Sequence, residues 1–448
     1  MKKLTTQQYA ELDKRYIWHP FTPMKPWCEA KEIITIERGE GEFLFDTDGR
    51  RYIDGSASIW CNVHGHNVPA LNQAVIDQLN QVSHSTLLGL ANPPAVLLAE
   101  QLIKIAPAGL TKVFYSDNGS TAVEVACKMA YQYWANLGRP RTRYIAFGSA
   151  YHGDTIGAVS LGGIGLFHQA FKSLCFEVDF VPPPTNERAT LAAVEKLLGE
   201  HQGQHAAIVV EPLILGAGGM IMYGPDVLRQ LRALADRYDT LLVFDEVMTG
   251  FGRTGKMFAA DHAGVTPDLM CLSKGLTAGY MPLGVTLTTQ RIFDAFYADP
   301  REGKTFFHGH TFTGHPLACA VALRSLELFE ENQLLAHVNR LEPILAEMLS
   351  RARGRPFVGA ARHCGLVGAI ELVDANGQPF DYHWRIGGAL CTRLREKGLM
   401  MRPLADVVVL MPPLAIREEN FRHFCEAVLD SLSWLPEIVA QKRNENRP

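Results

Sequence analysis

The stretch LLVFDEVMTGFGRTGKMFAADHAGVTPDLMCLSKGLTAGYMPLG, residues 241–284, decides the fold that we predict. It holds two short and mostly apolar runs, one over 240–244 that begins just before the stretch and one over 269–272. Asp245 directly follows the first run, and Lys274 follows the second run after a single serine. Short runs of this kind are typical of strands buried on both faces of a parallel sheet. The stretch therefore predicts two parallel strands with a carboxylate and an amine at their carboxyl ends.

The chain before this stretch repeats the pattern. Three more apolar runs, over 112–115, 143–147 and 207–210, are predicted strands, and 120–137 has apolar residues at helical spacing. Strands that alternate with helices imply an α/β domain whose mostly parallel sheet is covered on both faces. We place this large domain at residues 75–329.

The two ends of the chain have a different character. Residues 35–55 look like short antiparallel strands with a turn at Asp48-Gly49. After residue 330, helical segments alternate with strand-like runs, over 333–353, 365–372, 407–410 and 417–435. Because both ends are α+β in character, we expect residues 1–74 and 330–448 to form one small second domain.

Composition excludes several classes of protein. The 448 residues carry 43 Lys and Arg against 47 Asp and Glu without a basic stripe, so we expect no nucleic-acid partner. No apolar run approaches the roughly 18 residues of a membrane helix, and the first residues do not resemble a signal peptide. The nine cysteines are scattered and form no C-x-x-C pair, which favours reduced thiols and a cytoplasmic location. The histidines around 308–315 lack regular ligand spacing, so we expect no metal.

Polar groups follow each predicted strand, at the edge where open α/β sheets bind ligands. Gly119 and Ser120 open a helix, where backbone N–H groups can bind an anion or the residues can simply cap the helix. Tyr151 lies on the loop after the next strand and can stack on a planar ligand or pack the loop. Glu211 and Asp245 end two further strands. A carboxylate that is buried there needs a cationic partner, whereas one at the surface can simply cap the strand.

Lys274 is the most unusual of these residues, because lysine is rarely buried without a partner or a chemical role. Desolvation lowers the pKa of a lysine and makes its amine a nucleophile. An anion site, an aromatic ring, carboxylates and an amine at one sheet edge are what pyridoxal 5′-phosphate (PLP) requires. The combination therefore predicts a PLP site.

A second motif competes with this interpretation. Residues 250–255, GFGRTG, match G-x-G-x-x-G, but no strand directly precedes them, which argues against a dinucleotide site. The same stretch nearly spells a P-loop, yet Met257 stands where a Ser or Thr would reach magnesium. A nucleotide-binding module built on residues 250–256 stays open as an alternative.

The stretch 241–284 resembles the signature of class III PLP-dependent aminotransferases, with its DEV, GFGRTG and SKG segments and 29 residues between Asp245 and Lys274. Further matches cover nearly the whole chain, at WHPFT (18–22), VHGH (63–66), YHGD (151–154), HGHTF (308–312), MRP (401–403) and MPP (411–413). They resemble the branch of that family that transfers an amino group to 8-amino-7-oxononanoate in biotin biosynthesis. Another class III ω-aminotransferase, acting on an ω-amino acid or polyamine, is the alternative.

The resemblance implies a PLP-dependent transferase of fold type I, similar to aspartate aminotransferase, and a homodimer with shared active sites. It implies that Lys274 would carry PLP as a Schiff base and move the proton, while Asp245 would pair with the pyridine nitrogen. The other cofactor-binding positions that it implies are Gly119, Ser120, Tyr151, Glu211, His310 and, from the partner subunit, Thr311. The substrate-binding positions that it implies are Phe21, Ile59, Trp60, Tyr151, Lys274, Gly309 and Arg402, the last for the substrate carboxylate.

Three positions depart from the family pattern. Members that use S-adenosylmethionine as amino donor resemble one another in carrying Tyr at the position of Phe21 and Trp at that of Ile59. A branch that uses lysine resembles this sequence at both positions, so the donor stays open between the two, with a slight preference for lysine. Leu215 stands where the family pattern has Gln, which implies a different cofactor contact in the loop 211–219.

Overall fold

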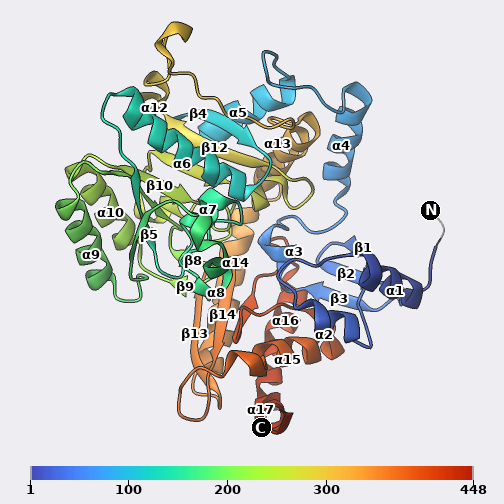
Figure 1. Ribbon diagram of the computed structural model, residues 1–448. Coiled ribbons are helices and arrows are strands. Elements are labelled where there is room, and N and C mark those ends of the chain that lie inside the picture. The colour runs from blue at the N-terminus through green and yellow to red at the C-terminus, as the bar shows by residue number, and fades with distance from the viewer. Residues whose placement is uncertain (1–2, 446–448) are drawn as a thin grey trace.

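A computed structural model describes residues 3–445. Its largest sheet has seven strands and lies in the upper part of the molecule in Figure 1. The strand order is β4-β12-β11-β10-β7-β5-β6. The strands are β4 (Leu110–Ser116), β5 (Arg143–Phe147), β6 (Val178–Val181), β7 (His205–Val210), β10 (Leu241–Asp245), β11 (Leu269–Leu272) and β12 (Gly284–Thr289). Neighbouring strands are parallel except at β12, which is antiparallel to both β11 and β4. The expected mostly parallel α/β sheet is confirmed.

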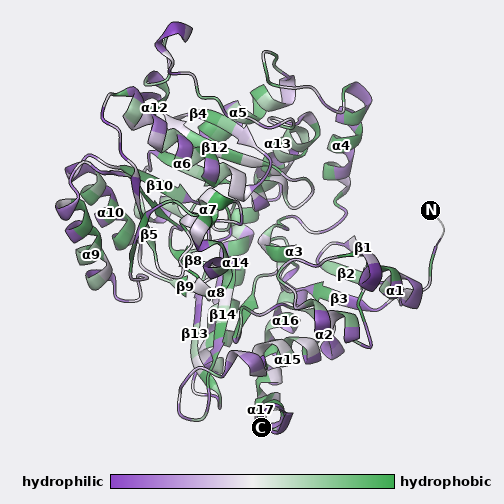
Figure 2. Ribbon diagram, viewed as in Figure 1, coloured by the Kyte–Doolittle hydropathy of each residue, from purple (hydrophilic) through white to green (hydrophobic). Residues whose placement is uncertain are grey.

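The central strands are buried on both faces, as their composition requires. In β10, Leu242 and Phe244 belong to one hydrophobic core, whereas Leu241 and Val243 belong to a second core on the opposite face. Figure 2 shows hydrophobic residues gathered in these strands and hydrophilic residues on the outer turns of α9 and α10. Two packed cores make the sheet a rigid base for residues at its edge.

Helices pack around the sheets (Figure 1). Their bounds are α1 (Thr6–Tyr16), α2 (Met24–Glu29), α3 (Ala57–Trp60), α4 (Pro69–Gln81), α5 (Pro93–Ile105), α6 (Gly119–Asn136), α7 (Ile156–Ser160), α8 (Gly165–His168), α9 (Glu187–Glu200), α10 (Pro225–Arg237), α11 (Ala260–Ala263), α12 (Gln290–Asp294), α13 (Pro316–Glu331), α14 (Leu334–Ala352), α15 (Ile386–Arg393), α16 (Glu418–Ser431) and α17 (Leu435–Glu445). The long helix α6 lies on the second core and begins directly after β4, as the sequence predicts. Among residues 3–445, no helix is long and apolar enough to cross a membrane.

Both chain ends contribute to a smaller sheet, as expected. The strands β1 (Ile36–Glu40), β2 (Phe43–Asp46) and β3 (Arg51–Asp54) form an antiparallel meander, and β15 (Leu399–Met400) joins it in parallel beside β3. The meander turns at Gly49, which has a φ of 82°. Figure 1 shows the blue N-terminal elements beside the orange and red C-terminal ones. The domain limits at 74/75 and 329/330 stay predictions.

Two further sheets complete the architecture. The strands β13 (Val358–Cys364), β14 (Val367–Leu372) and β16 (Val407–Leu410) form an antiparallel sheet near the C-terminal end. A short hairpin of β8 (Ile214–Leu215) and β9 (Ile221–Met222) extends from the loop after β7. The loops after β5, β7, β10 and β11 all leave the same edge of the central sheet, because these strands are parallel.

Candidate active site

Lys274 begins a short 3₁₀ helix (Lys274–Thr277) directly after β11, with its backbone in the left-handed region at a φ of 42°. Burial lowers the pKa of this lysine, and the charges of Asp245 and Glu211 offset only part of that effect. Within residues 3–445 the amine donates no recorded hydrogen bond; its Nζ lies 5.0 Å from the centre of the Trp60 ring. The amine is therefore poorly solvated and has no hydrogen-bonded partner among the described residues.

Asp245, the last residue of β10, is 5% exposed and is held by two donors. Its Oδ1 accepts a hydrogen bond from the Val247 amide at 3.1 Å, and its Oδ2 lies 2.7 Å from Nδ1 of His152. Burial lowers the pKa of His152, but the hydrogen bond to Asp245 and the charges of Asp245 and Glu211 outweigh it, so the net shift is upward. The other ring nitrogen of His152 is buried and has no hydrogen-bond partner in the part of the chain that the structure describes.

Glu211 is the second buried carboxyl group at this edge. It follows β7 and accepts hydrogen bonds from the amides of Tyr151 at 3.0 Å and Gly216 at 2.9 Å. Burial raises the pKa of Glu211 to about 7, against the lowering effect of His152. The carboxyl group therefore links the loop after β5, the end of β7 and the turn between β8 and β9.

Gly119 and Ser120 form the first turn of α6, next to the end of β10. The Asn118 side chain caps this helix by accepting from the Thr121 amide, which leaves the amides of Gly119 and Ser120 without a recorded acceptor in the described chain. A Cβ at Gly119 would lie 2.6 Å from Val247, so only glycine allows this close approach. These free amides at a long helix's N-terminus are suited to an anion.

Tyr151 belongs to a row of aromatic side chains. Its hydroxyl donates to Asp154 at 2.7 Å, and burial, together with Asp154, raises the pKa of this phenol. The Tyr151 ring is nearly parallel to that of His168, with 6.3 Å between centroids. Phe167 lies edge-on to Tyr151, at 6.3 Å, and to the half-exposed Phe21, at 5.2 Å. The row joins the predicted substrate position at residue 21 to the predicted ring-stacking position.

Ile59 and Trp60 lie in the segment α3, which is a left-handed turn: its four residues, 57–60, have positive φ values between 44° and 71°. Trp60 lies close both to the Lys274 amine and to the turn between β8 and β9, where a Cβ at Gly216 would come within 3.5 Å of its ring. Ile59 is 46% exposed. The turn thus presents the two predicted wall residues in a backbone conformation that glycine-free segments rarely adopt.

The remaining predicted positions are Arg402, His310, Gly309, Thr311 and Leu215. Arg402 follows β15 and is exposed; its amide donates to Ser56 Oγ at 3.1 Å, which places it next to the turn 57–60. His310 lies with Nδ1 3.6 Å from Asp117, just before α6. Gly309 and Thr311 are exposed, and no recorded contact of the described residues joins them to Lys274. Leu215 is fully buried in β8.

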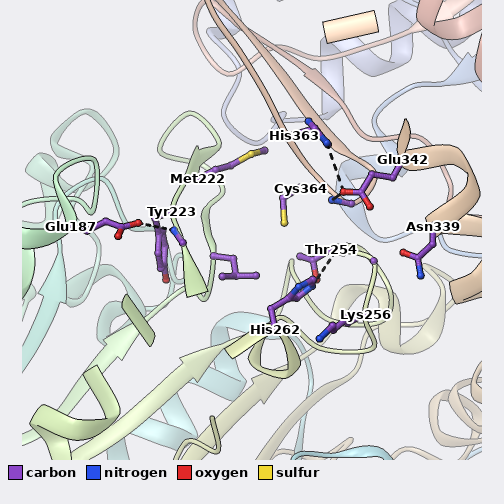
Figure 3. A pocket seen from close by; sticks show the side chains of 14 residues that line it. Glu187, Met222, Tyr223, Thr254, Lys256, His262, Asn339, Glu342, His363 and Cys364 are labelled. Carbon is purple, nitrogen blue, oxygen red and sulfur yellow. Dashed lines mark hydrogen bonds and ion pairs between the residues drawn. The ribbon is translucent and has the colours of Figure 1, made fainter. Parts of the chain in front are cut away.

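The GFGRTG loop joins distant segments of the fold. Arg253 is fully buried and donates to the carbonyls of Pro412 and Asn62, so the loop joins segments instead of exposing amides. A pocket of about 670 Å³ lies on the other side of this loop. Figure 3 shows Thr254, Lys256 and His262 on its floor, between Tyr223 on one wall and Glu342 on the other. None of the predicted site residues lines this pocket. Among residues 3–445, no group of three or more His, Cys, Asp or Glu could hold a metal ion.

A family model described as aminotransferase class-III matches residues 27–432. The chain belongs to this family. Its relatives include two proteins named adenosylmethionine-8-amino-7-oxononanoate aminotransferase. The one from Geobacter sulfurreducens is 49% identical over 96% of this chain and 99% of its own length, and the one from Aquifex aeolicus is 46% identical over 97% and 98%.

Solved structures of class-III aminotransferases have the same fold. That of adenosylmethionine-8-amino-7-oxononanoate aminotransferase from Methanocaldococcus jannaschii has a TM-score of 0.93 and 40% identity, covering 95% of this chain and 99% of that one. The omega transaminase from Pseudomonas jessenii in complex with PMP has a TM-score of 0.90 and 31% identity, covering 96% and 99%.

Class-III aminotransferases depend on PLP, and the residues present here fit that group. The amides of Gly119 and Ser120, at the N-terminus of the long helix α6, suit a phosphate. The Asp245 carboxylate suits a protonated ring nitrogen, and the Lys274 amine suits an aldehyde. The site therefore has a group for each part of the cofactor.

Sequence reasoning assigned no role to several residues that the structure brings into this site. His152 is bonded to Asp245, Asp154 to Tyr151, and Phe167 contacts Phe21. Both His152 and Asp154 lie in the YHGD segment, so their place after β5 was the available signal. No comparable signal marks Phe167, which lies in the short helix α8.

Proposed function

We propose that this class-III aminotransferase uses PLP to transfer an amino group to 8-amino-7-oxononanoate, which gives 7,8-diaminononanoate in biotin biosynthesis. The names of relatives that are 46–49% identical over nearly the whole chain support the substrate. The observation that carries the chemistry is the Lys274 amine. Its Nζ lies 5.0 Å from the centre of the Trp60 ring, burial lowers its pKa against the charges of Asp245 and Glu211, and it has no hydrogen-bonded partner in residues 3–445.

Lys274 would hold the cofactor and move protons. PLP, when bound, supplies an aldehyde and an electron sink. Because burial lowers the pKa of Lys274, a larger share of its amine is neutral, and this neutral Nζ would bond to the aldehyde carbon with release of water. Once released by the incoming amine, the same nitrogen can take a proton from the substrate carbon and return it at a neighbouring position.

Asp245 and the start of α6 would hold the cofactor at its other two ends. The carboxylate of Asp245, kept in place by His152 and the Val247 amide, would accept a hydrogen bond from a protonated ring nitrogen. The amides of Gly119 and Ser120 would donate to the phosphate. Tyr151 would cover the ring, and Glu211 would hold the Tyr151 loop in position through its hydrogen bond to that amide.

The substrate would lie along the wall formed by the turn 57–60. 8-Amino-7-oxononanoate has a carboxylate at one end and an apolar chain before its ketone. The exposed guanidinium of Arg402 suits the carboxylate, and Ile59, Trp60 and Phe21 offer apolar surface to the chain.

The amino donor of the proposed reaction is S-adenosylmethionine or lysine. The relatives' names favour S-adenosylmethionine, whereas Phe21 and Ile59 favour lysine. The two donors therefore form separate arms of the test below.

A homodimer with shared active sites belongs to the same proposal. Large apolar side chains of the single chain are strongly exposed, among them Trp18 at 86%, Leu88 at 89% and Phe307 at 84%. Exposed apolar surface of this kind is typical of an interaction site. In the dimer, Gly309, His310 and Thr311 would lie at the subunit boundary, with Thr311 reaching the partner's phosphate site. The nine cysteines, none of them in a disulfide within residues 3–445, are consistent with our proposed cytoplasmic location.

The test is product formation by purified protein with PLP and 8-amino-7-oxononanoate, given S-adenosylmethionine or lysine in separate reactions. Diaminononanoate from either donor, measured by mass spectrometry, is the expected result, together with a dimeric mass by light scattering. Failure with both donors, while simple ω-amines still bleach the cofactor absorbance, would assign the chain to another substrate of the same family.

A further inference from the structure

The turn 57–60 is held by one buried carboxylate. Asp54, the last residue of β3, is 2% exposed and accepts three hydrogen bonds. Two come from Ser58, from its amide at 3.0 Å and from its hydroxyl at 2.7 Å. The third involves Nε2 of His66 at 3.0 Å.

His66 is itself oriented by a second contact. Its Nδ1 lies 3.2 Å from the amide nitrogen of Asn62, which can only donate, so Nε2 carries the proton that is donated to Asp54. The oxygen of the Asn62 side chain accepts from the Gly65 amide at 2.8 Å. The carboxylate thus connects the start of the turn with the segment that leaves it.

The turn needs such an anchor, because its backbone is unfavourable. Ala57, Ser58, Ile59 and Trp60 all have left-handed φ values, and none is glycine. Backbone bonds within the turn contribute too: Trp60 donates to Ser56 and Cys61 to Ala57, each at 2.9 Å. Left-handed turns of L-residues persist only where the surroundings hold them.

We propose that Asp54 is a positioning residue of the active site, which fixes the left-handed turn 57–60 and thereby places Trp60 over Lys274 and Ile59 at the substrate wall. The part of this inference that concerns the substrate wall and KM rests on the proposed function. Asp54 touches neither the Lys274 amine nor any other residue of the cofactor site in the recorded contacts of residues 3–445; it acts through Ser58 and His66.

Cys61 provides a direct reporter of this turn. Its thiol donates to the Ser58 carbonyl at 3.2 Å, and burial raises its pKa, so we expect slow alkylation while the turn is closed. A pocket of about 290 Å³ that Ser58, Cys61 and His66 help to line gives a reagent access. Peptide-resolved mass spectrometry separates Cys61 from the other cysteines.

Asp46 supplies a matched control. It lies in the same small sheet, is also 2% exposed, and accepts from Arg50 and Tyr52, but it does not contact the turn. Asp54→Ala and Asp46→Ala should both lower the melting temperature. Only Asp54→Ala should speed iodoacetamide labelling of Cys61 by about tenfold or more and raise KM for the amino acceptor by a similar factor, with a smaller change in kcat.

Glycine at position 58 tests the backbone argument. Because glycine adopts the left-handed region freely, Ser58→Gly in the Asp54→Ala background should return the Cys61 labelling rate toward that of the wild type. Asp54→Asn, which keeps an acceptor for the Ser58 amide, serves where the alanine variant does not fold; it should label at an intermediate rate. Equal effects of Asp54→Ala and Asp46→Ala on labelling and KM, or no recovery with Ser58→Gly, would overturn the proposal. The labelling rate of Cys61 tests the positioning role without any substrate, whereas KM depends on the substrate. Faster labelling without turnover of 8-amino-7-oxononanoate would therefore contradict the proposed function and not the positioning role.

Discussion

Replacement of His152 by alanine tests the buried pair at the centre of the site. The variant removes the donor that lies 2.7 Å from Asp245 Oδ2 and leaves the carboxylate, 5% exposed, with only the Val247 amide. Removing one partner of a buried charged pair costs about 3–5 kcal/mol, because the remaining charge stays buried without compensation. We expect the free energy of unfolding of the cofactor-free protein to fall by about this amount, measured in urea at one fixed protein concentration.

His205→Ala is the matched control for this prediction. His205 is also buried, in the same sheet, and its Nε2 lies 2.8 Å from Asp179. Asp179, however, keeps two hydrogen bonds from Arg143, at 2.8 and 2.5 Å. The control variant also lacks an imidazole, but Asp179 gives up only one hydrogen bond. Its free energy of unfolding should therefore fall less, by about 1–2 kcal/mol. Equal losses in the two variants would refute the argument that His152 compensates the charge of Asp245.

Three further substitutions test the proposed roles. Lys274→Ala should lower turnover by about 10³-fold or more while the circular dichroism spectrum stays native; activity near that of the wild type would exclude Lys274 as the reacting amine. Arg402→Ala should raise KM for 8-amino-7-oxononanoate by about 10- to 100-fold with little change in kcat, in line with the loss of a charged hydrogen bond; an unchanged KM in steady-state assays would exclude it as the carboxylate anchor. Glu211 has a pKa raised from 4.5 to about 7 in the folded state, so the folded protein favours the protonated acid and loses about 2–3 kcal/mol of stability between pH 5 and 8. In Glu211→Gln, the free energy of unfolding measured in urea should fall less between pH 5 and pH 8 than in the wild type. An equal fall in the two proteins would contradict the prediction.

The central strands could be predicted because burial on both faces leaves a clear apolar pattern. The expected runs 143–147 and 269–272 coincide with β5 and β11. The strand β12 was not predicted, because it contains Thr286 and Thr288, which are buried but donate their hydroxyl groups to the carbonyls of Ala122 and Asp268. Threonines satisfied in this way cannot be distinguished from exposed ones in a sequence.

The candidate site was predictable where a polar residue directly follows a strand. Asp245, Glu211 and Lys274 satisfy that rule, and the structure brings them to one edge of the sheet. The turn 57–60 could not be predicted, because left-handed backbone is expected at glycine and none of its residues is one. Its conformation depends on Asp54 and on contacts from the other end of the chain, which no local pattern contains.

The turn 57–60 stands on the small sheet, whereas the reacting groups of the site stand on the central sheet. The contacts between the two sheets therefore set the geometry of the site. β15 pairs with β3, the Arg402 amide donates to Ser56, and the Met411 amide donates to Gly55, so the C-terminal segment supports the turn 57–60 directly. Lys274 and Asp245 stand instead on the central sheet. Arg253, on the loop after β10, joins the two parts through the carbonyls of Asn62 and Pro412. This guanidinium is buried, and its hydrogen bonds within residues 3–445 go to carbonyl groups. It therefore holds the two parts together without placing a further carboxylate beside the Lys274 amine. A substrate held by Arg402 would therefore meet Lys274 at a distance set by the small sheet and by the loop of Arg253 together.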